Sequence, residues 1–188
     1  MTNKEKSIHN LHQARTSHIR WVNTIKLLVS GIEVSEDSIQ VNPTDALFGQ
    51  WFYDEAMLFS LGTSRMVLEE IEILFLSLHD KYMKIYPIYY SSKKRSLLGG
   101  LIGGKSKASE HEIELSQRYY EEIVVLSDKL KHKLRILESQ LMSLPLEKFD
   151  TVAELTKPSL SSVVIQQPIP EPVDNEETAY FYGTRGRG

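Results

Sequence analysis

The chain of 188 residues contains no cysteine. This excludes disulfide bonds, thiolate nucleophiles and zinc sites with cysteine ligands, and it fits a reducing compartment. No apolar run approaches the roughly 20 residues of a membrane-spanning helix, and the first segment has no secretory apolar core. The net charge of -3 gives no general basic field for nucleic acid. These absences predict a cytoplasmic protein that binds no nucleic acid.

The first half of the chain instead holds apolar residues at helical spacing. Over residues 4–30 they recur at steps of three and four, which predicts a long amphipathic helix. Asn42 and Pro43 are typical of a helix start, because Asn caps the first turn and Pro fits it. The apolar face that follows predicts a second helix that continues to Phe59.

Two further helices are expected in the second half of the chain. The third covers about residues 64–86, and Pro87 should kink or end it, because proline removes a backbone donor and clashes with the preceding turn. The fourth covers about residues 109–144 and begins with Ser109 and Glu112 at the spacing of a capping box.

Four amphipathic segments joined by loops predict an all-α fold, an antiparallel four-helix bundle formed by residues 1–144. A basic, glycine-rich loop at 91–107 connects the third and fourth helices. Prolines become frequent after the fourth helix, so residues 145–188 are expected to form a flexible, largely disordered tail with an aromatic and Arg-Gly terminus. A short helix near 147–155 is the exception within it.

Three positions stand out as candidates for a site. His18 lies on the apolar stripe of the first helix, where it is either a core histidine bonded to a neighbour or a metal ligand. Gly49 lies inside a strongly apolar helix, where it is either simply tolerated or allows another helix or an aromatic ring to approach its backbone closely. Phe75 and His79 are one turn apart and share a face of the third helix. The two histidines could meet across the bundle.

The strings around these positions resemble the chemoreceptor zinc-binding (CZB) domain of bacterial chemoreceptors and diguanylate cyclases. The family pattern is His-x-x-Trp, then Cys-x-Phe/Leu-Gly-x-Trp, then His-x-x-x-His. The matching strings are His18-Ile19-Arg20-Trp21, Ala46-Leu47-Phe48-Gly49-Gln50-Trp51 and Phe75-Leu76-Ser77-Leu78-His79. The resemblance covers about residues 8–90. A second register would pair His79 with Met83, but Phe75 and His79 fit the family's distance from Trp51 better.

The resemblance implies a zinc site held by three histidines and one cysteine. At those positions the chain keeps His18 and His79 as metal ligands, whereas Ala46 and Phe75 offer no donor atom. Zinc takes about four donors, so two imidazoles alone make a weak site. The favoured interpretation is a degenerate CZB domain that has lost or weakened its zinc site and needs no cofactor. The alternative is a zinc sensor that completes the site with non-family donors such as Asp45.

No catalytic constellation is present in the sequence, so the chain is not expected to be an enzyme. The leading hypothesis is a bacterial signalling bundle that acts through contacts with a signalling, cytoskeletal or envelope protein. A structural adaptor at the membrane or cell pole, docking through residues 91–107 and the tail, is another alternative. The leucine spacing of the fourth helix is compatible with a homodimer. A pH response through His18 and His79, titrating near neutrality, is a further hypothesis.

Overall fold

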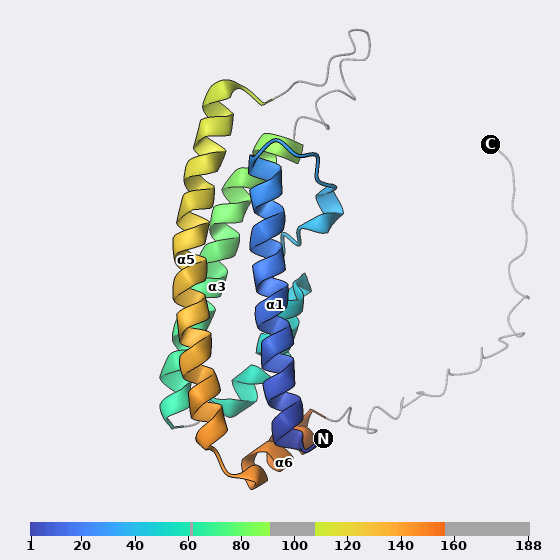
Figure 1. The fold of residues 1–188 in the computed structure, drawn as a ribbon, viewed down its shortest axis with the longest axis vertical. Helices are drawn as coiled ribbons and strands as arrows, with labels where there is room; N and C mark the ends of the chain where they lie inside the picture. The colour runs from blue at the N-terminus through green and yellow to red at the C-terminus, as the bar shows by residue number, and fades with distance from the viewer. Residues whose placement is uncertain (61, 91–107, 157–188) are drawn as a thin grey trace, which may run out of the picture. The chain divides into compact units, whose positions relative to one another are not determined.

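Figure 1 shows the computed structural model, which describes residues 1–60, 62–90 and 108–156. Every regular element in these ranges is helical and none is a strand, which confirms the all-α prediction. All of the described residues belong to one compact unit. None of the helices in the described ranges has the length and apolarity needed to cross a membrane. The predicted loop at 91–107 and the predicted tail from 157 onward lie outside the described residues.

Three long helices dominate this unit: α1 (Asn3–Val29), α3 (Thr63–Tyr90) and α5 (Glu110–Ser143). Their bounds lie close to those predicted for the first, third and fourth helices. The capping box predicted before α5 is confirmed, because the Ser109 side chain accepts from the Glu112 backbone while the Glu112 carboxylate accepts from the Ser109 backbone. This exchange satisfies two backbone donors that a helix start otherwise leaves open.

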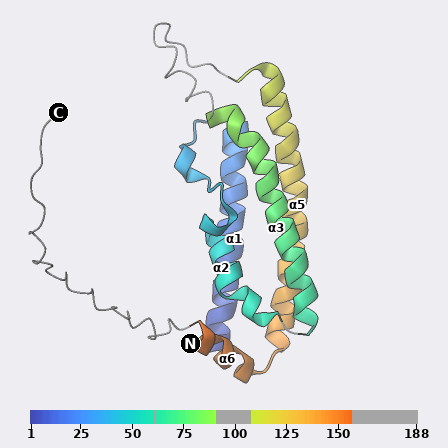
Figure 2. The same ribbon diagram turned by 180° about the vertical axis from the view of Figure 1, so that it is seen from behind.

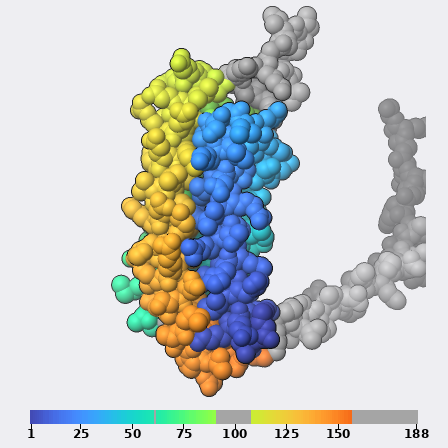
Figure 3. Space-filling view, in the orientation of Figure 1, coloured from blue at the N-terminus to red at the C-terminus, as the bar shows by residue number. Residues whose placement is uncertain are grey.

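The long helix α5 packs along both α3 and α1. Figures 1 and 2 show that α1 and α3 run in the same direction and that α5 runs in the opposite one. In the space-filling view of Figure 3, α1 (blue) and α5 (yellow to orange) lie side by side along the visible face. The interior between the helices is filled by aliphatic and aromatic side chains, among them the fully buried Leu11, Ile25, Leu68, Ile71, Leu78, Ile123, Leu130 and Leu134.

The second predicted helix is broken into short pieces. A 3-10 turn, η2 (Pro43–Asp45), precedes α2 (Leu47–Asp54), and a second 3-10 turn, η3 (Ala56–Phe59), follows it. The predicted cap is real but serves η2: the Asn42 side chain accepts from the backbone of Thr44. The expected continuous helix to residue 59 is therefore wrong in its extent, although α2 still packs against α1.

Two chain segments run further than expected. Pro87 does not end α3, which continues to Tyr90. Proline leaves only the carbonyl four residues earlier, that of Met83, without a helical donor, so a proline in the last turn costs the helix one backbone bond. The short helix expected near 147–155 is confirmed as α6 (Leu146–Leu155), which packs against α1 through the buried Phe149. The compact unit thus extends past residue 144, where the bundle was expected to end.

Candidate functional site

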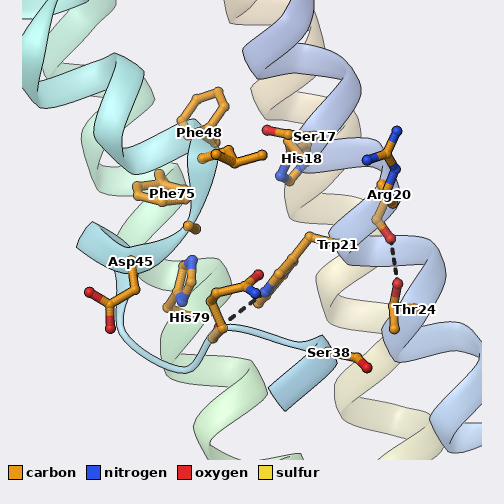
Figure 4. Close-up of a pocket in the computed structure, with 13 residues that line it drawn as sticks. Ser17, His18, Arg20, Trp21, Thr24, Ser38, Asp45, Phe48, Phe75 and His79 are labelled. Carbon is orange, nitrogen blue, oxygen red and sulfur yellow. Dashed lines mark hydrogen bonds between the residues drawn. The ribbon is translucent and has the colours of Figure 1, made fainter. Parts of the chain in front are cut away.

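One cavity of about 320 Å³ brings the residues of the three sequence strings together (Figure 4). Its lining includes His18 from α1, Ala46 at the N-terminal end of α2, and Phe75 and His79 from α3. These are the four positions to which the CZB resemblance assigns zinc ligands. His18 and His79, which are 61 positions apart in the chain, thus line the same cavity.

Gly49 creates the close approach that its place in the sequence predicted. A Cβ atom on this residue would lie 2.0 Å from the carbonyl oxygen of Pro43 and 3.3 Å from the Cε1 atom of Phe75. Only glycine lets the η2 turn fold back onto the first turn of α2. The contact holds Ala46, which links the two elements, at the cavity.

An aromatic network surrounds the two histidines. The ring centroids of Trp21 and His79 are 4.7 Å apart, and those of Phe75 and His79 are 4.8 Å apart. Phe48 contacts Phe75 at 4.7 Å and His18 at 5.7 Å. The two imidazoles therefore line the same cavity, as predicted for residues that meet across the helices, and Trp21, Phe48 and Phe75 contact them.

His18 is a satisfied core histidine. It is 2% exposed, and its Nε2 atom lies 2.9 Å from the Oγ atom of Ser127 on α5. Burial lowers the pKa of His18 to about 3, with smaller contributions from the charge of Lys131 and from His79. The imidazole is therefore neutral throughout the physiological range, and the bonded-core interpretation of this residue accounts for its position on the α1 stripe.

His79 has a defined tautomer because its Nδ1 atom lies 3.0 Å from the carbonyl oxygen of Val41. A carbonyl only accepts, so Nδ1 carries the proton and donates it, which leaves Nε2 with a free lone pair. Burial lowers the pKa of His79, opposed by the Val41 carbonyl and by the charge of Asp80. Both histidines are thus displaced to lower pKa, away from the near-neutral titration hypothesised from the sequence.

The donor set does not fit a zinc ion. The Ala46 methyl group and the Phe75 ring place hydrocarbon at two of the four positions to which the resemblance assigns zinc ligands. Asp45 also lines the cavity, yet nowhere in the described ranges do three or more His, Cys, Asp or Glu side chains come together in a way that could hold a metal. Zinc needs three protein donors even in an open site.

The sequence reasoning missed the partners that fix these rings. The Trp21 indole donates from Nε1 to the carbonyl oxygen of Gln40 at 3.1 Å, which, with the bond from His79, secures the segment between α1 and η2 across the cavity. Ser127 could have been found, because it lies on the buried stripe of α5 between Ile123 and Leu130. The backbone partners Gln40 and Val41 carry no side-chain signal.

Comparisons with protein-family models, with curated proteins and with solved structures find no match to this chain.

Proposed function

We propose that the chain is a non-catalytic regulatory module of the CZB type, working in bacterial signalling, in which packing replaces the zinc site. The proposal rests on one observation: the same cavity is lined by His18, Ala46, Phe75 and His79. Four positions chosen from sequence strings alone would rarely converge by chance. In this proposal α1, the α2 region, α3 and α5 form an antiparallel four-helix arrangement, with the second member shortened to α2 and its flanking turns.

The alternative of a zinc sensor is less well supported because its donors are missing. His18 already bonds Ser127, and the Nδ1 atom of His79 already bonds Val41. The metal content of the purified chain separates the two functions. We expect zinc far below one ion per chain and no change on His18→Ala. Near-stoichiometric zinc that is lost on His18→Ala would favour the sensor instead.

A groove between α3 and α5 supports a role in protein contact. A shallow groove of about 510 Å³ between α3 and α5 is lined by Ile73, Leu74 and the side chains of Lys129 and Lys133. Ile73 is 65% exposed, although it is a large apolar side chain. The groove is also lined by charged side chains of both signs, and Lys133 forms an ion pair with Glu70. Exposed apolar surface framed by charges is typical of a protein interface.

A photo-crosslinking amino acid at residue 73 tests the protein-contact role in the native host. We expect a discrete adduct with another protein from position 73 and none from position 142. Met142 is a matched control, because it is 56% exposed and lies at the far end of α5. Adducts of equal yield from both positions, or none from position 73, would contradict contact through this surface.

A further inference from the structure

We propose that the cavity beside His79 binds a small uncharged aromatic molecule that carries an O–H or N–H donor, which the Nε2 atom of His79 accepts. This inference goes beyond the proposed regulatory function and does not depend on it, because it follows from the size, walls and polar atoms of the cavity alone.

The cavity has the size and walls of a small ligand site. Its volume of about 320 Å³ lies at the lower end of the roughly 300–1,000 Å³ found for ligand pockets. The rings of Trp21, Phe48 and Phe75 line it, and Figure 4 shows them around a common space with the two imidazoles. Rings of this kind favour a flat aromatic guest through offset and edge-to-face contacts. A large cofactor would not fit.

The polar recognition comes from His79. His79 is only 3% exposed, and its hydrogen bond to the Val41 carbonyl uses only Nδ1. No hydrogen bond reaches Nε2 from any residue in the described ranges, and Nε2 is not one of the fully enclosed polar atoms that lack a partner there, so the atom keeps contact with solvent. It is therefore open to accept from a ligand donor that displaces water. Ala46, with the smallest side chain that has a Cβ, lines the same cavity and fills little of it.

Charge excludes the other ligand classes. His18, Ala46, Phe48, Phe75 and His79 are buried residues of the cavity lining, and desolvation among them disfavours a charged guest. The charged lining residues, Arg20 and Asp45, are exposed and carry opposite signs, so they give the entrance no strong preference for an ion. A neutral phenol, indole or azole meets these conditions.

Fluorine NMR with 4-fluorophenol tests the inference, and 4-fluoroanisole is the matched probe, because it keeps the ring and lacks the donor. We expect a saturable change of the 4-fluorophenol signal and about tenfold weaker binding of 4-fluoroanisole, the value of one hydrogen bond. Absence of saturable binding, or equal binding of the two probes, would overturn the proposal.

Two substitutions of His79 locate the acceptor. The amide of Asn replaces the Nδ1 donor toward Val41 but puts nothing at Nε2, whereas Gln places an amide oxygen near Nε2. His79→Asn should therefore lose the discrimination between the probes, and His79→Gln should retain it. The opposite order would refute recognition by Nε2.

A filling substitution locates the cavity itself. Ala46→Leu should abolish binding of both probes, whereas Ala153→Leu on α6, outside the cavity lining, should leave it unchanged. Helical circular dichroism checks that each variant folds. Should Ala46→Leu not fold, the His79 pair decides alone. Unchanged binding in a folded Ala46→Leu variant would show that the probes bind elsewhere.

Discussion

Single side chains decide what the cavity can do. Ala46 and Phe75 place hydrocarbon at two of the four positions that the CZB resemblance assigns to zinc ligands, and Gly49 lets the η2 turn approach α2 beside them. Zinc-mediated cross-linking of helices is worth many kcal/mol, whereas burial of one phenylalanine contributes about 1.5–3 kcal/mol. In the proposed function, these side chains contribute packing at the wall of the cavity and no donor for a metal.

Gly49→Ala should destabilise the fold. The new methyl group would collide with the Pro43 carbonyl, at a cost of about 1–3 kcal/mol for overpacking, which outweighs the gain of up to about 1 kcal/mol in helix propensity. Urea unfolding measures the difference. The neighbouring exposed Gln50→Ala is the control and should change the free energy of unfolding by less than about 0.5 kcal/mol. Equal effects of both would refute the close approach.

The buried His18 predicts how stability depends on pH. Its pKa is about 3 in the folded chain and about 6.5 when unfolded, so below about pH 6.5 the unfolded state binds a proton that the folded state does not. Stability therefore falls as pH decreases through this window, and is fully present above it.

His18→Gln, which keeps a polar group toward Ser127, removes this proton uptake. Between about pH 6 and pH 4, the free energy of unfolding should fall more steeply in the unmodified chain than in the variant, by up to about 1.4 kcal/mol per pH unit. Urea titrations at several pH values measure both slopes. Parallel slopes would mean that His18 is protonated in the folded chain.

At the scale of helices, periodicity and capping were enough to predict α1, α3 and α5. The second helix was mispredicted in its extent because the backbone leaves the helical conformation twice, at the extended Ala46 before α2 and at Glu55 after it, and neither residue type signals a break. Pro87 was expected to kink or end the third helix. It lies in the last turn of α3, where it removes only the backbone bond to the carbonyl of Met83, so the helix continues to Tyr90. Within the site, His18 and His79 were predictable from their stripes, whereas their backbone and cross-helix partners were not.

The short helix α6 should contribute measurably to stability. Phe149 is 1% exposed, its ring centroid lies 5.2 Å from that of Phe59, and the Nζ atom of Lys4 lies 5.5 Å from it. Phe149→Ala should cost about 3–5 kcal/mol in the free energy of unfolding. The control on the same helix is Leu155→Ala, which changes a side chain that is 65% exposed and should cost less than about 0.5 kcal/mol. A small loss for both would place α6 outside the cooperative unit.

At the scale of the whole unit, the two candidate surfaces lie on different sides of α3. The side that faces α1 carries Phe75 and His79 in the cavity, and the outer side carries Ile73 in the groove shared with α5. One helix thus adjoins both the cavity and the groove that we propose as a protein-contact surface. In our account, occupation of the cavity and binding of a partner are two properties of the same helix.

Restoring the missing donors tests the central claim most directly. In Ala46→Cys/Phe75→His, the new cysteine stands at the N-terminal end of α2, where the helix dipole favours a thiolate. Calorimetric zinc titration should show one ion per chain, bound at least about a thousandfold more tightly than by the unmodified chain. Zinc binding by the folded double variant no tighter than by the unmodified chain would contradict the claim that these four positions are a converted metal site.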